Sequence, residues 1–203
     1  MAQWINLFRA AGHTNYRVYI PDRFIEDYGL TPAAVEKCLS SQKPRLIIAV
    51  DCGSTSIEAL EVLKSKGVDV IVIDHHQVHS DELHPSFAHL NPKGDPRLST
   101  STALQDAALM SAAGLVFFVA DRLAELAGIA KWDRVANLLL AGLGTYVDVM
   151  PLLGTNRALV KHSLAIANTP AIHRVIGLSS LLEANGWRGK KVTEYTYGFV
   201  LGP

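Results

Sequence analysis

Cysteine is scarce in this chain of 203 residues, which contains only Cys38 and Cys52. The two lie far apart in sequence and match neither a zinc-binding spacing nor a disulfide framework. Because nothing in the sequence calls for an oxidising compartment, we expect a cytoplasmic protein. The N-terminus also lacks the basic start, apolar core and cleavage site of a secretory leader.

Long apolar runs and an excess of one charge are missing as well. Charges or glycines interrupt the apolar stretches before they reach the roughly 20 residues that span a bilayer, so we expect no membrane partner. Lysine plus arginine equals aspartate plus glutamate, so no basic tail or patch indicates a nucleic acid. A neutral total does not exclude one, because a local groove can still carry positive potential.

Two short runs of β-branched residues, 46–50 and 68–73, predict buried strands. Apart from Asp69 they are apolar rather than alternating, which is typical of strands covered on both faces in a parallel sheet. An amphipathic segment joins them, so we expect a right-handed strand–helix–strand unit. The predicted fold class is α/β, with a parallel sheet flanked by helices at about 14–95 and a mainly helical part at about 102–190.

Weaker signals complete this picture. Residues 17–20 predict a further short strand, and 197–203 a strand and turn. Residues 77–101 are rich in proline and aspartate and predict a long loop. The stretch 102–128 predicts one or two helices around Gly114.

Polar residues follow both buried strands at the point where each strand ends. Asp51 follows the first, and as a lone residue it favours a turn or cap before the next helix, for which Ser54 or Thr55 are also candidates. Asp74-His75-His76 follows the second. Burying three adjacent titratable groups without partners would cost several kcal/mol. The alternative is that all three are exposed on a loop.

A third candidate acid, Asp148, lies between Val147 and Val149. An acid in an apolar run needs a hydrogen bond, a cation or a metal, and a salt bridge to Arg157 is the simplest alternative. The other histidines lack such a context. Three of them share the long loop and are expected to be solvated there: His79, His84 and His89.

Aspartates and histidines at neighbouring strand ends suit a divalent cation, because ligands bind at the carboxyl ends of parallel strands. Carboxylate with imidazole suits Mn²⁺, and carboxylate with water suits Mg²⁺. Two such ions bridged by a carboxylate would activate a water and clamp a phosphoryl oxygen.

The motif Asp74-His75-His76 resembles the signature of the DHH phosphoesterase superfamily, and the flanking motifs match in order and spacing. These are Asp51-Cys52-Gly53 before it and residues 144–152 after it. Further segments narrow the resemblance to the RecJ branch: 19–23, 28–30, 91–93, 113–118 and 156–160.

The resemblance implies a RecJ-like hydrolase, a 5′-to-3′ exonuclease on single-stranded DNA in DNA repair and recombination. Its partners would be single-stranded DNA and single-strand-binding or replication and repair proteins, and its cofactor two Mn²⁺ or Mg²⁺ ions. The resemblance also implies a role for each motif residue. Asp51 would bridge the two metals, and His75 and Asp148 would be metal ligands. Asp74 would orient the ligand histidine, His76 would face the scissile phosphate, and Arg157 and Arg23 would contact the substrate.

The family pattern is not matched throughout. Its opening strand with an Asp-rich motif and its second domain, DHHA1, are not found, so we expect a partial DHH domain at 1–203 with little or no nuclease activity. Mn²⁺-dependent trimming of 5′-phosphorylated single-stranded DNA, abolished by Asp74→Ala, would overturn that expectation. The bulky Tyr146 replaces a small residue beside the expected metals.

Two alternatives remain open at this point. One is a catalytically inactive DHH scaffold or binding module, which has no need for a ligand set. The other is a DHH phosphatase acting on a small nucleotide. Metal binding separates the first alternative from the enzyme.

Overall fold

The computed structural model describes residues 1–22, 24–26, 28–41, 43–78 and 84–202, and it divides into two compact units. We call Asn15–Ala108 the sheet unit. Met1–Thr14 together with Leu109–Pro203 form the helical unit. The N-terminal helix therefore belongs with the later helices and not with the sheet that follows it in sequence.

The sheet unit contains three strands and three α-helices in its described residues. In chain order its elements are α2 (Pro32–Ser41), β1 (Leu46–Val50), α3 (Ile57–Ser65), β2 (Asp69–Ile73), β3 (Ala88–Leu90), the 3₁₀ turn η1 (Pro92–Gly94) and α4 (Thr102–Ala107).

The strands form one parallel sheet in the order β1-β2-β3. Leu46 pairs with Asp69 and Val50 with Ile73, so β1 and β2 end side by side. The predicted α/β class with a parallel sheet is thereby confirmed. This register brings the polar residues that follow the two strands to one edge of the sheet.

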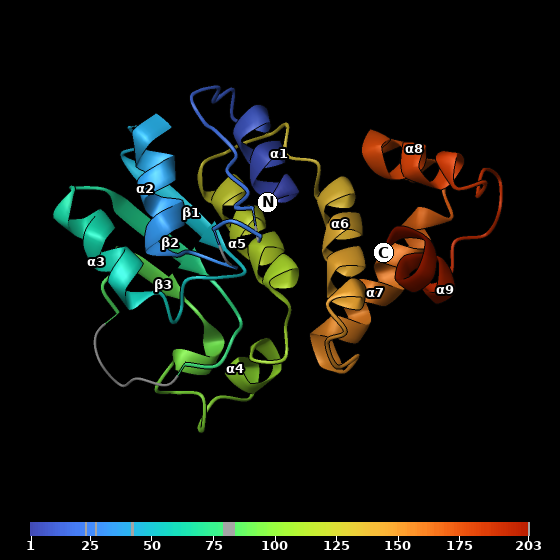
Figure 1. The fold of residues 1–203 in the computed structure, drawn as a ribbon. Helices are drawn as coiled ribbons and strands as arrows, with labels where there is room; N and C mark the ends of the chain where they lie inside the picture. The colour runs from blue at the N-terminus through green and yellow to red at the C-terminus, as the bar shows by residue number, and fades with distance from the viewer. Residues whose placement is uncertain (23, 27, 42, 79–83, 203) are drawn as a thin grey trace. The chain divides into compact units, whose positions relative to one another are not determined.

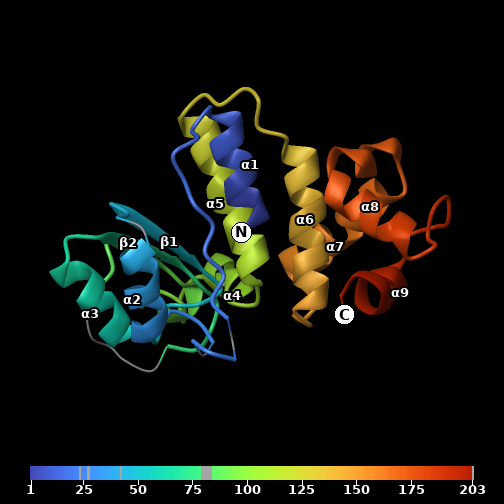
Figure 2. The same cartoon turned by 45° about the horizontal axis from the view of Figure 1, so that its top comes forward.

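Helices α2 and α3 lie on the same face of the sheet (Figures 1 and 2). Val70 and Val72 point to this face and pack with Val35, Leu60 and Leu63, all of them buried. Ile73 points to the opposite face and is also buried. Burial on both faces explains why β2 is apolar without alternation.

One strand prediction and one loop prediction in this unit were wrong. Residues 17–20 form no strand, and Val18 and Ile20 are 44% and 74% exposed, since β-branched residues alone do not provide a neighbouring strand to pair with. Conversely, β3 lies inside the predicted long loop. It is only three residues long, too short to show a periodicity, and it is defined by its pairing with Ile71–Ile73.

The helical unit begins with α1, and its other elements come after residue 108. They are α1 (Ala2–Ala10), α5 (Ala112–Leu126), α6 (Arg134–Val147), α7 (Gly154–Ala167), the 3₁₀ turn η2 (Pro170–Arg174), α8 (Ile176–Ala184), α9 (Glu194–Thr196) and the π-helical turn η3 (Tyr197–Leu201). Within the described residues, none of the helices has both the length and the apolar character needed to cross a membrane.

The C-terminal segment is helical, so the strand predicted at 197–203 was wrong. Tyr197 is fully buried, and its hydroxyl lies 2.6 Å from Oγ of Ser163. Leu201, one turn later, packs against the same apolar cluster. The four-residue spacing between them is that of a helix face, and it outweighs the β-forming composition of the segment.

Helix α6 packs against both α5 and α7. Gly142 allows α7 to approach, because a Cβ built there would lie 2.2 Å from Cβ of Ser163 and 2.6 Å from the carbonyl oxygen of Leu159. The break between α4 and α5 falls at residues 108–111. The stretch predicted as one or two helices around Gly114 therefore forms two, and Gly114 lies inside α5.

Gly142→Ala should therefore destabilise the helical unit by about 1–3 kcal/mol through overpacking, although alanine is the better helix former. Gly177→Ala in α8 is the matched control, because a Cβ there meets nothing within 4 Å. We expect it to leave stability unchanged or to raise it by up to about 1 kcal/mol. Urea denaturation measures the free energy of unfolding of both variants. An equal change in Gly142→Ala and Gly177→Ala would contradict the close packing of α7 at Gly142.

Candidate metal centre

Asp51 sits in a sharp turn at the end of β1. Its N–H donates to the carbonyl oxygen of Ile73 at 3.0 Å, which extends the ladder by one step. It then takes φ +65°, a left-handed conformation that aspartate tolerates better than most residues. The chain turns again at Gly53 (φ +111°), where a Cβ would lie 3.1 Å from the side chain of Val72.

The predicted caps of the following helix were wrong. Ser56 occupies the N-cap of α3 and makes no side-chain cap hydrogen bond. Ser54 instead turns its N–H to the carboxylate of Asp74, at 3.0 Å from Oδ2. The loop after β1 is therefore tied to the loop after β2.

Asp74 is 1% exposed and is the centre of this contact. Its Oδ1 accepts from the N–H groups of His75 (2.8 Å) and His76 (3.3 Å), and it lies 2.7 Å from Nδ1 of His76. Burial alone would raise the pKa of Asp74, but the hydrogen bonds from His76, Ser54 and His75 together lower it to about 2. Asp74 is therefore an ionised and fully bonded anchor, and the reading of this motif as an exposed loop was wrong for it.

The two histidines of the motif are held differently. The His75 side chain is 9% exposed and the His76 side chain 51%. Because the ionised Asp74 can only accept, Nδ1 of His76 carries the hydrogen, and its Nε2 faces away from the anchor. One imidazole is thus buried and the other is presented to solvent.

Asp51 and His75 meet in a geometry that suits a shared cation. Oδ1 of Asp51 lies 3.1 Å from Nε2 of His75. This Oδ1 is buried, and it has no hydrogen-bond partner among the described residues. With His76, one donor atom from each of the three residues lies within 4.8 Å of the others. A buried carboxylate oxygen facing an imidazole is a donor set that Mn²⁺ accepts, so these residues fit the metal.

Asp148 is the C-cap of α6 and is exposed. A carboxylate at a helix C-terminus is disfavoured by the helix dipole. The next residue, Val149, takes φ +57°, a left-handed conformation that is energetically unfavourable for a β-branched residue. Unfavourable choices at two successive positions are typical of a functional site.

The structure describes one of the two predicted arginines. Arg157 is exposed on α7, and Arg23 lies outside the described residues. Tyr146 does not lie alongside Asp148. Its ring packs edge-on against Tyr197 at 6.1 Å, inside the helical unit, because successive helix positions point in different directions.

Two histidines that were expected to be solvated are instead part of this region. His84 and His89 are half-buried and stack at 3.9 Å. Nε2 of His84 donates to the carbonyl oxygen of Gly53, and Nε2 of His89 lies 2.9 Å from Oγ of Ser54. Burial, aided by the nearby His84, lowers the pKa of His89 to about 4, so its ring is neutral at pH 7. The sequence carries no pattern that marks these two histidines, because β3 spans only three residues.

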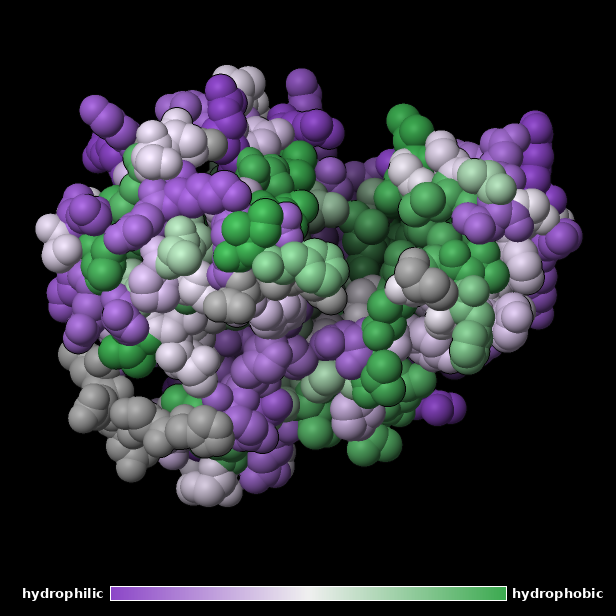
Figure 3. Space-filling view, viewed as in Figure 1, coloured by the Kyte–Doolittle hydropathy of each residue, from purple (hydrophilic) through white to green (hydrophobic). Residues whose placement is uncertain are grey.

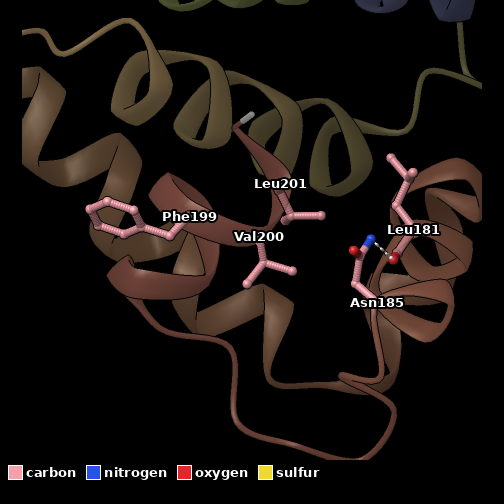
Figure 4. A pocket seen from close by; sticks show the side chains of 5 residues that line it. All are labelled: Leu181, Asn185, Phe199, Val200 and Leu201. Atoms are coloured by element: carbon pink, nitrogen blue, oxygen red, sulfur yellow. Dashed lines mark hydrogen bonds between the residues drawn. The ribbon is translucent and has the colours of Figure 1, made fainter.

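A separate pocket of about 410 Å³ lies in the helical unit between α8 and η3 (Figure 4). Its lining is Leu181, Asn185, Phe199, Val200 and Leu201, with Asn185 donating to the carbonyl oxygen of Leu181. Apolar side chains gather on the surface over this part of the chain (Figure 3). The lining holds no titratable group, so the pocket offers no metal or acid–base chemistry.

A comparison with known proteins decides the family. Residues 1–143 match a family model described as the DHH family, N-terminal domain. The chain belongs to the DHH family. This confirms the resemblance that was inferred from Asp74-His75-His76 and its flanking motifs.

Curated relatives and solved structures narrow the match within the DHH family. The chain is 37% identical over 174 residues to the single-stranded-DNA-specific exonuclease RecJ of Thermus thermophilus, which covers 86% of this chain and 24% of that protein. It is 30% identical over 204 residues to the Escherichia coli protein of the same name, and this match covers 96% of this chain and 34% of that protein. The chain thus spans about a quarter to a third of the length of these relatives.

Two solved structures share its fold over the whole chain. One is a crystal structure of exonuclease RecJ bound to manganese, with a TM-score of 0.78, 31% identity and 47% of that chain covered. The other is a crystal structure of RecJ from Thermus thermophilus in complex with Mn²⁺, with a TM-score of 0.73, 29% identity and 26% covered. This DHH-family chain is therefore RecJ-like in both sequence and fold.

The depressed pKa of Asp74 makes stability depend on pH. A carboxylate whose folded pKa lies below its unfolded value stabilises the fold above the unfolded pKa, and this effect is lost as the pH falls through the folded value of about 2. Metal-free Asp74→Asn should be less stable than the unsubstituted chain by about 2 kcal/mol at pH 7, and the difference should shrink below about pH 4.

Urea denaturation between pH 7 and about pH 2.5 measures this difference. Asp69→Asn is the control, because Asp69 is exposed at the start of the same strand. A difference between Asp74→Asn and the unsubstituted chain that stays constant over this range would contradict the anchor role of the carboxylate.

Val149→Gly should stabilise the helical unit by about 1–2 kcal/mol, because glycine adopts a left-handed conformation without penalty. The valine side chain is 86% exposed, so little packing is lost. Val147→Gly, in the last turn of α6, should instead destabilise by about 1 kcal/mol. Thermal melting compares the two variants. A change in melting temperature of the same sign in Val149→Gly and Val147→Gly would show that the backbone of Val149 is not strained.

Proposed function

We propose that this chain carries the metal-binding part of a RecJ-like exonuclease that hydrolyses single-stranded DNA from the 5′ end in repair and recombination. The observation that carries the proposal is the buried Oδ1 of Asp51, which has no hydrogen bond among the described residues and lies 3.1 Å from Nε2 of His75. The RecJ relatives and the manganese-bound RecJ structures support it.

In this proposal Asp51 and His75 hold Mn²⁺ or Mg²⁺, with Asp148 as a further ligand. A metal pair supplies an activated water and neutralises charge on the phosphoryl group. Asp74 was expected to orient the ligand His75, but its carboxylate contacts the imidazole of His76 through Nδ1 and only the backbone N–H of His75. In this proposal the opposite nitrogen of His76 is presented to the scissile phosphate. Arg157 and Arg23 are proposed to contact the DNA backbone, since a guanidinium binds phosphate bidentately.

The proposal extends to partners and compartment. Single-stranded DNA is the substrate, and single-strand-binding or replication and repair proteins are its expected partners. A DNA substrate and two free cysteines agree with the cytoplasmic location expected from the sequence.

Removing one carboxylate ligand tests the metal site. Mn²⁺ should raise the melting temperature of the unsubstituted chain, because it binds only the folded state. Asp51→Asn should weaken Mn²⁺ binding by at least about tenfold, as measured by calorimetry and by the shift in melting temperature. Asp69→Asn, which removes an exposed carboxylate of the same unit, should bind Mn²⁺ normally.

The absence of any Mn²⁺-induced shift in the unsubstituted chain would favour the catalytically inactive scaffold. Equal affinity in Asp51→Asn and the unsubstituted chain would show that the metal binds elsewhere.

Fluorescence anisotropy in the presence of Mn²⁺ tests the substrate class. A 5′-phosphorylated single-stranded oligonucleotide should bind more tightly than the blunt duplex of the same sequence, and more tightly than a dinucleotide. Arg157→Gln should weaken binding severalfold and lower its salt dependence. Arg122→Gln, an exposed arginine of α5 that pairs with Glu125, is the charge-matched control. Tighter binding of the dinucleotide would favour the small-nucleotide phosphatase.

A further inference from the structure

A layer of polar side chains from residues 84–91 underlies the candidate metal centre. We propose that Asn91, with Ser54 and His89, forms a positioning network that fixes the loops carrying Asp51 and His75-His76. The inference rests on the proposed function, because it assigns roles toward that same site.

Asn91 is 7% exposed and uses the whole of its side-chain amide. Its Oδ1 accepts from the N–H of Lys93 at 3.0 Å, which caps η1. Its Nδ2 donates to the carbonyl oxygen of His76 at 2.8 Å and to Oγ of Ser54 at 2.9 Å. The single amide therefore joins the ends of β2 and β3 to the loop after β1.

Ser54 passes this restraint to the anchor carboxylate. It is 4% exposed, and its N–H donates to Oδ2 of Asp74. Its Oγ accepts from Asn91, which leaves the hydroxyl hydrogen available for Nε2 of His89, 2.9 Å away. Each side-chain polar atom of Asn91 and Ser54 has a partner, which is the condition under which a polar network stiffens its surroundings.

The network reaches both motif loops without contacting the candidate donor atoms. Asn91 holds the carbonyl of His76 while Asp74 holds its N–H and its ring, so the peptide and imidazole are fixed together. Ser54 lies three residues after Asp51, beyond the turn at Gly53. Neither an apolar core nor capping of η1 requires the two Nδ2 bonds, which points to positioning rather than to stability alone.

Asn91→Ser isolates this role. Serine keeps a side-chain oxygen suited to the N-cap of η1, adds no charge, and removes both Nδ2 donors. The matched control is Asn185→Ser, at an exposed helix end where Nδ2 donates only to the carbonyl oxygen of Leu181. Ser54→Ala removes the middle of the same network and serves as a second variant.

Two readouts are used on the 203-residue chain. Without metal, amide hydrogen exchange at His75 and His76 should accelerate at least about tenfold in Asn91→Ser, with little change in the β1–β2 ladder. With metal, calorimetry should show a Mn²⁺ dissociation constant raised by about tenfold or more. The double variant, Asn91→Ser with Ser54→Ala, should raise the Mn²⁺ dissociation constant by less than the product of the factors for the two single variants.

The outcomes are distinguishable. Unchanged amide hydrogen exchange at His75 and His76 in both variants would overturn the positioning role, whether or not the Mn²⁺ dissociation constant changes. A uniform acceleration across the sheet would also overturn it, since it would show a general loss of stability. If the unsubstituted chain binds no Mn²⁺, the proposed function fails, and the metal-free exchange still decides the role of Asn91.

Discussion

The carboxylate of Asp74 is the constraint on which the candidate site depends. A buried charge is tolerated only when hydrogen bonds replace its hydration. Asp74 obtains them from the loop after β1, through Ser54, and from its own loop, through His75 and His76. Satisfying one carboxylate therefore forces two chain segments that are distant in sequence into a single arrangement.

The parallel register makes this arrangement possible. Because Val50 pairs with Ile73, β1 and β2 end at the same level, and the N–H of Asp51 adds one more ladder bond to Ile73. The left-handed turn at Asp51 and the glycine at position 53 then bend the chain back toward Asp74. The imidazole of His75 and the carboxylate of Asp51 therefore lie close together as a consequence of strand pairing.

Much of this could be predicted from the sequence, for identifiable reasons. The strands 46–50 and 69–73 are apolar apart from Asp69, and the acids and histidines that follow two neighbouring parallel strands must lie at one edge of the sheet. The three-residue β3 could not be predicted, because its identity depends on pairing with β2 rather than on a pattern of its own. The same holds for His89, which looks like a loop residue until β3 carries it against Ser54, and for His84, whose ring stacks on that of His89.

Asp148 shows the limit of arguing from neighbouring residues. Its flanking valines form an apolar run in the sequence, but they lie at the exposed end of α6, where the backbone of Val149 is left-handed. Local hydrophobicity cannot distinguish an apolar core segment from a strained helix end. The unfavourable dipole and the backbone strain at this point become visible only in three dimensions.

The central claim is that Asp51 and His75 share a divalent cation. Pulsed electron paramagnetic resonance of Mn²⁺ bound to histidine-labelled ¹⁵N protein tests it most directly, because it detects a directly coordinated imidazole. We expect a ¹⁵N hyperfine coupling in the unsubstituted chain and its loss in His75→Gln. Bound Mn²⁺ with no imidazole coupling, or with a coupling that survives His75→Gln, would contradict the account.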